Sequence, residues 1–379
     1  MAMTADGLKS RAPHLLAGST LGNWARLLVH NGRPSRRRLG RAAKITACVL
    51  LTAPLRGWES IRYRRRLSHV VLDPAPVFVL GHWQAGLTPV HHLLSRDLQF
   101  GTVTLLHCAF PAGFLSLKKP LSRFLQRRMP PDRLVDSLPV GLHAPQGEDM
   151  ALAGLSDLSF YHAYTFPRTA ERTFRRAVLF EGVSERAIRR WTSLYVRFLQ
   201  KVAFDTGRPR LLLRNCSNTG RIPLLLRRFP QARFVHVYRN PCRIYAALSQ
   251  RWQGLLSAWS LQEYSLEMMQ EHTLRFFELL MRRYFEDRSQ IPAGHLAEVR
   301  YEDFEADPLG AAEAIYRELD LPGFDEARGP MQEYLAARTG ALGGGADVPL
   351  GDEEVERVTQ RWGFAFDQWG YSPFGAAAG

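Results

Sequence analysis

Two segments of the sequence combine residue types that can hold a phosphate group. The first, residues 81–88, reads GHWQAGLT and lies between the apolar run VFVLG and the helical stretch PVHHLLSRD. A glycine-bearing turn between a strand and a helix can aim backbone N–H groups and a helix N-terminus at an anion. The second segment places Arg239 at the end of the apolar run FVHVYR, directly before Asn-Pro and a helix, which is typical of an anion clamp. Each signal alone is weak, because two glycines also suit a plain turn and Arg239 can form a structural salt bridge.

Four short apolar runs, at 77–81, 211–214, 234–239 and 296–301, must position these segments. Helical patterns separate the runs, as expected for parallel strands that are covered on both faces. The alternation predicts an α/β fold with a central parallel sheet, flanking helices and right-handed crossovers. Ligands of such sheets bind beyond the carboxyl ends of the strands, so we expect the chemistry directly after residues 81, 214 and 239.

The charge balance of the chain favours an anionic partner. Its 379 residues include 50 Lys and Arg against 36 Asp and Glu, which gives a formal net charge of +14, and nearly all of the cations are Arg. Arginine makes forked contacts with phosphate, sulfate or carboxylate groups. A nucleotide or an acidic membrane surface would suit this charge. The sequence has no zinc-finger, helix-turn-helix or aromatic RNA-binding pattern, so we do not expect a nucleic acid partner.

Cysteine usage and the N-terminal sequence bear on the location of the protein. Cys48, Cys108, Cys216 and Cys242 are widely scattered, without paired or metal-ligand spacing. This scatter fits a reducing compartment, and we expect no metal ion. The first residues lack the apolar core of a secretory signal, and no apolar run reaches the roughly 20 residues that span a bilayer. The sequence therefore predicts a cytoplasmic protein.

Residues 1–70 are expected to form a basic, helical N-terminal extension to a main domain at 71–379, with an amphipathic helix at about 41–66. Basic flanks around a short apolar centre are typical of a helix that lies on an anionic membrane surface. The alternative is a helix that packs on the main domain with its arginines in water. The sequence leaves both arrangements open.

Several motifs in a consistent order resemble the sulfotransferase family over about residues 71–325. VFVLGHWQAGLT is similar to the phosphosulfate-binding loop of that family and FVHVYRNP to its 3′-phosphate-binding segment, while LLLRNCSNTGRIPLLLRRFP, APQGEDMALAGL and EVRYEDFEADPLG also look like the family. The resemblance implies a P-loop-like sulfotransferase fold, 3′-phosphoadenosine 5′-phosphosulfate (PAPS) as the sulfuryl donor, and an alcohol, phenol or amine as the acceptor. The PAPS-binding residues that it implies are Gly81, His82, Trp83, Gln84, Gly86, Thr88 and Arg239.

Four positions depart from the family pattern. Gln84 stands where the family has a basic residue, Ala85 and Leu87 replace a Ser and a Thr, and Ala247 replaces a Ser. A charged hydrogen bond contributes about 1.5–3 kcal/mol and a neutral one about 0.5–1.5 kcal/mol, so the four changes would weaken PAPS binding by roughly 3–7 kcal/mol if they were additive. The missing basic residue would also have stabilised charge on the leaving phosphate. The sequence thus predicts an atypical active site.

Sulfuryl transfer requires a base near the acceptor hydroxyl group. Glu148 and Asp149 match the acidic pair of the family's Pro-Gln-acidic-acidic segment, and the resemblance implies that one of them is the base. His107 lies on the segment that usually lines the acceptor pocket, and His92 occupies a place where the family often has an acidic residue or Asn. Each candidate also has a structural interpretation. The two carboxylates could lie on the surface or cap a helix, and the two histidines could be hydrogen-bonded in the core. Aromatic residues around the loops predict a hydrophobic acceptor, unless they are simply part of the core.

Three functions are compatible with these patterns. The first is an enzyme that transfers a sulfuryl group from PAPS to a hydroxyl group of a hydrophobic small molecule. The second is a homologue that no longer uses PAPS and acts on an apolar substrate with a phosphate or diphosphate, such as a prenyl diphosphate undergoing cyclisation. The third is a non-catalytic homologue on a decayed enzyme fold. The altered phosphate loop argues against the first function, and the polar residues of the acceptor region argue against the third.

Overall fold

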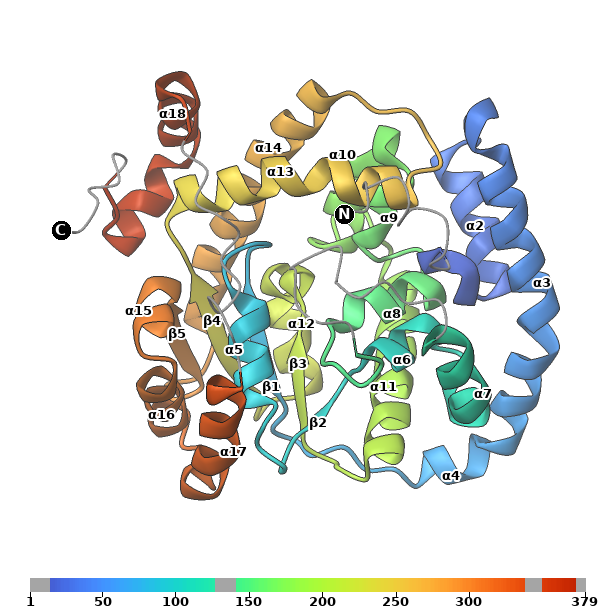
Figure 1. Ribbon diagram of the computed structural model, residues 1–379, viewed down its shortest axis with the longest axis horizontal. Coiled ribbons are helices and arrows are strands. Elements are labelled where there is room, and N and C mark those ends of the chain that lie inside the picture. The colour runs from blue at the N-terminus through green and yellow to red at the C-terminus, as the bar shows by residue number, and fades with distance from the viewer. Residues whose placement is uncertain (1–13, 127–140, 338–349, 373–379) are drawn as a thin grey trace. The chain divides into compact units, whose positions relative to one another are not determined.

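The computed structural model describes residues 14–126, 141–337 and 350–372 (Figure 1). Contacts within the chain define two compact units. The first unit takes its residues from 1–74, 99–213 and 254–264, and the second takes the remainder, from 75–98, 214–253 and 265–379. The division into an extension at 1–70 and a main domain at 71–379 stays a prediction.

Three parallel strands form the sheet of the second unit. They are β1 (Val77–Gly81), β4 (Arg233–Tyr238) and β5 (Leu296–Arg300). β4 lies in the middle, and its residue Val235 pairs with Val79 of β1 and with Ala297 of β5. All five residues of β1 are buried, as expected of a strand covered on both faces. The helices of this unit include α5 (Leu87–Leu94), η4 (Cys216–Arg221), α12 (Ile222–Arg228), α14 (Leu266–Asp287), α15 (Tyr301–Ala306), α16 (Pro308–Glu318), α17 (Phe324–Ala336) and α18 (Asp352–Trp369).

The first unit contains a shorter parallel pair and most of its residues are helical (Figure 1). β2 (Gly101–Thr102) pairs with β3 (Leu211–Arg214), and the register places Gly101 opposite Leu211. The long helix α13 (Pro241–Trp259) contributes residues to both units. The helices of the first unit include α2 (Leu21–Asn31), α3 (Leu39–Arg62), α4 (Arg64–Ser68), α6 (Leu105–Ala109), α7 (Phe114–Gln126), α8 (Glu148–Leu155), α9 (Tyr161–Thr165), α10 (Ala170–Ala177) and α11 (Glu185–Thr206).

The predicted fold class is confirmed, because the chain is an α/β protein with a parallel sheet and flanking helices. The four predicted strands are present with ends that differ by one residue at most, and among the described residues only the two-residue β2 was not anticipated. Local signals also fixed two helix starts: the side chain of Ser184 caps α11, and that of Asp307 caps α16. The helix expected at 41–66 differs, since the structure divides it at Tyr63 into α3 and α4.

An aromatic contact fastens α18 to the core of the second unit. Trp362 is fully buried and stacks on Phe277 of α14 with 3.8 Å between the ring centres. Its indole N–H donates a hydrogen bond to the carbonyl oxygen of Leu274 at 3.0 Å. The side chain therefore combines apolar burial with a satisfied polar group.

We expect Trp362→Ala to lower the free energy of unfolding by about 3–5 kcal/mol, because it leaves a large cavity in the core. The matched control is Trp58→Ala, since Trp58 is 51% exposed and its removal should change stability by about 0.5 kcal/mol or less. Urea unfolding followed by circular dichroism measures both values. Equal losses in the two variants would contradict the prediction.

Candidate active site

The candidate phosphate loop, residues 81–88, connects β1 to α5 (Figure 1). Gly81 has a φ of +137°, and a Cβ atom there would collide with a backbone carbonyl oxygen of β4. Gly86 has a φ of +96° at the start of α5, and a Cβ atom there would overlap the ring of Tyr301. Gln84 has a φ of +70°, a left-handed conformation that is uncommon outside glycine. Such backbone persists only where its surroundings hold it, so the loop is fixed in one shape.

A threonine from the segment after β3 fixes the start of the loop. The backbone N–H of Gly81 donates to the hydroxyl oxygen of Thr219 at 2.8 Å, and this hydroxyl donates to the carbonyl oxygen of Gly81 at 3.1 Å. Thr219 is fully buried in η4. Nearby, the backbone N–H of Asn215 donates to the carbonyl oxygen of Val79 on β1. The residues that follow β3 therefore support the phosphate loop.

The second predicted phosphate segment is joined to the loop by Tyr301. Arg239 follows β4 and is 5% exposed, and its guanidinium carbon lies 4.9 Å from the centre of the Tyr301 ring. The same ring occupies the space beside Gly86. Next to it, Glu302 accepts a hydrogen bond from the backbone N–H of Asn240 at 3.1 Å. The start of α15 thus contacts both segments, which the structure brings together in one unit.

Arg214, to which the sequence patterns gave no role, also reaches the loop. Its Nη1 donates to the hydroxyl oxygen of Thr88 at 2.5 Å, in the first turn of α5. A cation beside a helix N-terminus is unfavourable, because that end of the helix dipole is itself positive. Arg214 and the start of α5 therefore converge where an anion would stabilise both. One sequence signal could have identified Arg214, because it is the last residue of a predicted strand and ligands bind beyond such strand ends.

His82 does not add positive charge to the loop. Burial lowers the pKa of this histidine to about 3. Its Nδ1 lies 3.0 Å from the carbonyl oxygen of Trp83, and because a carbonyl oxygen only accepts, Nδ1 carries the proton. The neutral ring packs against Phe277 with 4.9 Å between the ring centres. Arg214 and Arg239 are the cationic side chains that these contacts place at the two phosphate segments.

The predicted acid–base residues fall in both units. Glu148, Asp149 and His107 belong to the first unit, and His92 to the second. Glu148 is fully buried at the start of α8, where its Oε1 accepts a hydrogen bond from the hydroxyl group of Tyr195 at 2.9 Å. A carboxylate in this position is also favoured by the positive end of the helix dipole. The catalytic role of these four residues stays a prediction.

Asp149 and His107 hold neighbouring segments in place. Oδ2 of Asp149 accepts a hydrogen bond from the backbone N–H of Phe160 at 3.1 Å. Nδ1 of His107 accepts from the backbone N–H of Thr104 at 3.1 Å, so its Nε2 donates to Oδ2 of Asp205 at 3.1 Å. Burial lowers the pKa of His107, against the opposing effect of Asp205. Both ring nitrogens are engaged, and proton uptake would require a hydrogen bond to break.

The order of these motifs agrees with a sequence profile of the sulfotransferase family, which matches residues 76–326. The chain belongs to the sulfotransferase family. This sulfotransferase is 27% identical over 361 residues to the omega-hydroxy-beta-dihydromenaquinone-9 sulfotransferase Stf3 of Mycobacterium bovis, and the match covers 95% of this chain and 92% of the relative. The Stf3 protein of Mycobacterium tuberculosis matches with the same identity and coverage.

Two solved sulfotransferase structures have the same fold. STF1 of Mycobacterium tuberculosis superposes with a TM-score of 0.65 at 18% identity, covering 95% of this chain and 93% of that one. STF9 of Mycobacterium avium gives a TM-score of 0.66 at 16% identity, covering 92% and 90%. The resemblance seen in the motifs is confirmed, and the protein is a sulfotransferase-like transferase.

We expect Gly86→Ala to lower the free energy of unfolding by about 3 kcal/mol or more. Left-handed backbone costs a non-glycine residue about 1–3 kcal/mol, and the overlap with Tyr301 adds to this cost. Gly370→Ala is the matched control, because Gly370 has a φ of +67° but a Cβ atom there would have open space within 4 Å. Urea titration measures the free energy of unfolding of both variants, and the difference between them gives the cost of the overlap with Tyr301. A loss in Gly86→Ala no larger than that in Gly370→Ala would contradict the prediction.

Proposed function

We propose that this sulfotransferase transfers a sulfuryl group from PAPS to a hydroxyl group of a hydrophobic small molecule. The observation that carries the proposal is the position of Arg214, whose guanidinium group contacts Thr88 at the start of α5. It provides a positive charge at the phosphate loop, although Gln84 stands at the position that is basic in the family pattern. The activity for which the relatives are named, sulfuryl transfer, supports the same reaction class.

The residues of the second unit fit a ligand with several phosphate groups. The loop backbone at 81–88 and the N-terminus of α5 would hold the 5′-phosphosulfate, and Arg239 would hold the 3′-phosphate. PAPS, when bound, supplies the sulfuryl group, and the nucleotide leaves as 3′-phosphoadenosine 5′-phosphate. Arg214 would stabilise the negative charge that grows on this leaving group, which a preorganised cation does without reorganisation.

Arg214 also changes the energetic argument made from sequence. The four departures from the family pattern suggested a loss of roughly 3–7 kcal/mol in PAPS binding. One charged hydrogen bond from Arg214 would restore about 1.5–3 kcal/mol of this loss. We therefore propose a weakened rather than an abolished site for PAPS.

Glu148 is the base that we propose. Burial of a carboxylate is costly unless hydrogen bonds compensate, and Tyr195 provides such a bond while it orients the group. Asp149 is engaged with the backbone of Phe160, and both ring nitrogens of His107 are occupied. Glu148 would accept the proton of the acceptor hydroxyl group as the oxygen–sulfur bond forms.

A hydrophobic acceptor is supported by the relatives and by the aromatic content of the first unit. The relatives are named for an omega-hydroxy-beta-dihydromenaquinone-9. In this chain Tyr161, Tyr164 and Trp259 pack together with 5.7–6.0 Å between ring centres. We propose a cytoplasmic enzyme that meets such an acceptor at an anionic membrane.

The second candidate function, action on a prenyl phosphate or diphosphate, would use the same cations. Gln84, Ala85 and Leu87 favour it, because each removes a contact to the sulfuryl donor. Titration with farnesyl diphosphate beside 3′-phosphoadenosine 5′-phosphate, with mass analysis of the products, separates the two. Formation of a cyclised prenyl product without nucleotide binding would favour this second function.

Arg214→Gln and Arg239→Gln should each weaken binding of 3′-phosphoadenosine 5′-phosphate about 10- to 150-fold, the equivalent of one charged hydrogen bond. Calorimetric titration measures the change. Arg282→Gln is the control, because Arg282 is an exposed arginine of α14 paired with Glu278. Full affinity in both test variants, or no nucleotide binding by the unaltered protein, would remove PAPS from the proposal.

Glu148→Gln should lower kcat about 100-fold or more with little change in nucleotide affinity, because only proton transfer is lost. Tyr195→Phe should lower kcat by about tenfold or less, since the carboxylate remains but loses its orienting partner. Transfer to farnesol, followed by mass spectrometry, provides the assay. The control is Glu171→Gln, at a surface glutamate of α10. Unchanged turnover in Glu148→Gln would move the role of base to another residue.

A further inference from the structure

Helix α3 buries charged side chains and exposes apolar ones. Arg56 and Glu59 are 7% and 2% exposed, whereas Leu51 and Ile61 are each 78% exposed. Charged residues are rarely buried in proteins, and large apolar residues usually are. The second half of α3 therefore presents its apolar face to the outside.

Contacts within the first unit hold α3 in this orientation. Glu59 forms an ion pair with Lys201 at 2.7 Å and accepts a hydrogen bond from the backbone N–H of Ser116 at 2.7 Å. The guanidinium carbon of Arg56 lies 5.8 Å from the centre of the Phe110 ring, which belongs to another segment of the unit. Rotation of α3 to hide its apolar face would separate the buried carboxylate of Glu59 from Lys201 and Ser116, which is strongly unfavourable.

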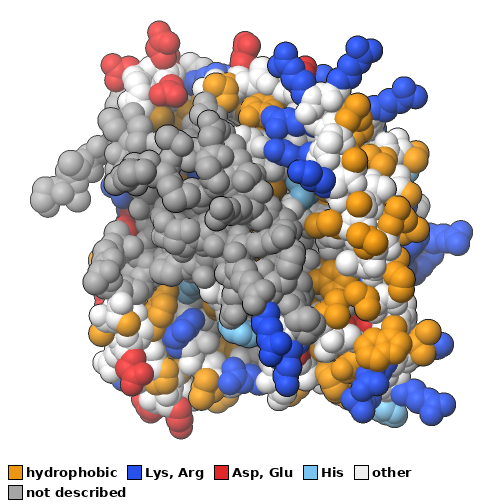
Figure 2. Space-filling view, turned by 45° about the vertical axis from the view of Figure 1, so that its right-hand side comes forward, with side chains coloured by type: hydrophobic (Ala, Val, Ile, Leu, Met, Phe, Trp, Pro, Cys, Tyr) orange, Lys and Arg blue, Asp and Glu red, His pale blue; other side chains and the backbone are white. Residues whose placement is uncertain are grey.

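The exposed apolar residues follow helical spacing along one face of α3. Figure 2, which turns the side of α2 and α3 forward, shows hydrophobic side chains gathered there between Lys and Arg side chains. The apolar stripe consists of Leu39, Leu50, Leu51, Leu55, Trp58 and Ile61. Among the described residues, no helix is long and apolar enough to cross a membrane. The stripe has the character of a helix that lies on a membrane surface.

The charge around the stripe has one sign. Residues 14–72 contain twelve Lys and Arg and a single acidic residue, Glu59, which is buried against Lys201. Cations flank the stripe at both ends, in the runs 36–38 and 62–66. The outward charge of this part of the chain is therefore almost entirely positive.

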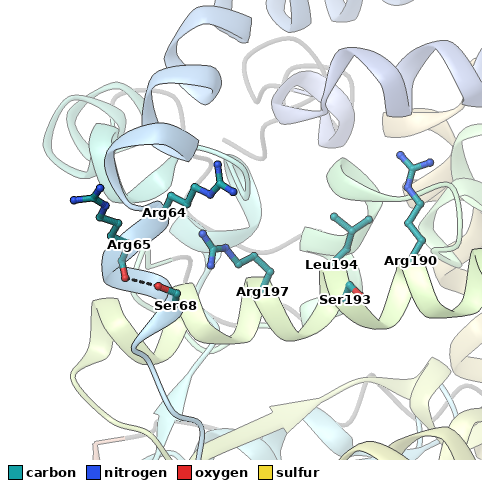
Figure 3. A pocket seen from close by; sticks show the side chains of 7 residues that line it. All are labelled: Arg64, Arg65, Ser68, Arg190, Ser193, Leu194 and Arg197. Atoms are coloured by element: carbon teal, nitrogen blue, oxygen red, sulfur yellow. Dashed lines mark hydrogen bonds between the residues drawn. The ribbon is translucent and has the colours of Figure 1, made fainter.

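Four arginines gather in a pocket beside the C-terminal end of the stripe. Arg64 and Arg65 of α4 and Arg190 and Arg197 of α11 line a surface pocket of about 780 Å³. Figure 3 shows Arg190 and Arg197 projecting from the same side of α11, and Arg64 projecting from α4 over that helix. Within the described part of the chain, none of the four has a carboxylate partner. Such a group of guanidinium side chains suits a phosphate group.

We propose that α3, α4 and α11 form a docking surface for an anionic lipid bilayer. The apolar stripe enters the interface between headgroups and acyl chains, and the arginines that line the pocket contact phosphates of anionic lipids. A second copy of the chain is a poor occupant, because two such surfaces would oppose cations with cations. The proposal extends the hydrophobic acceptor of the proposed function, since it brings the enzyme to the phase in which such an acceptor dissolves.

The test is flotation of the full chain with phosphatidylcholine vesicles, with and without phosphatidylglycerol, at low and high salt. No sulfuryl donor or acceptor is added, so failure to bind vesicles leaves the proposed reaction standing. We expect binding to be about tenfold or more stronger on the anionic vesicles and to fall at high salt, because several cations contribute.

Two double variants examine the two parts of the surface. Arg64→Gln with Arg197→Gln should weaken anionic-vesicle binding about tenfold or more, and Leu51→Ser with Leu55→Ser should weaken it by a similar factor. The matched control, Arg282→Gln with Arg328→Gln, removes two arginines of the second unit that have carboxylate partners and should leave binding within about twofold. Circular dichroism and thermal unfolding establish that each variant is folded.

Three outcomes would overturn the proposal. The first is equal binding to neutral and anionic vesicles, or binding to neither. The second is a dimer, seen by mass photometry, that Leu51→Ser with Leu55→Ser converts to a monomer while vesicle binding is lacking. The third is calorimetric binding of inorganic phosphate that depends on Arg64 and Arg197 without any binding to vesicles. Salt-sensitive binding to anionic vesicles that both double variants weaken would support it.

Discussion

The ring of Tyr301 lies against Gly86 on one side, and the guanidinium group of Arg239 lies near it. This packing is the constraint on which the candidate site depends, because it joins the turns that leave β1, β4 and β5. No side chain larger than hydrogen fits at Gly86, so the phosphate loop and the start of α15 must approach closely. The hydroxyl group of Thr219 then fixes the first residue of the loop from a fourth segment. These contacts fix the shape of the candidate phosphate loop, and a preformed loop would lower the cost of binding the proposed ligand.

The charge of a phosphate site depends on where a cation lies in space rather than on its place in a motif. Gln84 removes a cation from the loop, yet Arg214 reaches the first turn of α5 from the end of β3. A guanidinium group at the positive end of a helix is mildly unfavourable, and an anion between them would stabilise both. The contact of Arg214 with Thr88 is therefore the observation behind the proposed anion site, although Gln84 leaves the loop itself without a cation.

Buried charges also decide which side of the N-terminal region faces outward. Glu59 pairs with Lys201 of α11 inside the first unit, and this ion pair determines the rotation of α3 about its axis. The consequence is an apolar stripe on the surface next to many cations. Contiguous exposed apolar surface of this kind usually marks an interaction site. The two features together are the basis of the proposed docking to an anionic bilayer.

The sequence by itself determined the strands, the helix starts at Ser184 and Asp307 and the class of the fold, because these depend on short-range periodicity and capping. The motifs also indicated the family, and they are the basis of the two predicted phosphate segments. Only the tertiary structure decided the contact of Arg214 with Thr88, 126 residues away, and the pairing of His107 with Asp205, 98 residues away. It alone decided that α3 turns Leu51 outward and Glu59 inward, against the usual rule of burial. Local patterns state what each residue prefers, whereas such contacts depend on which distant partners the folded chain supplies.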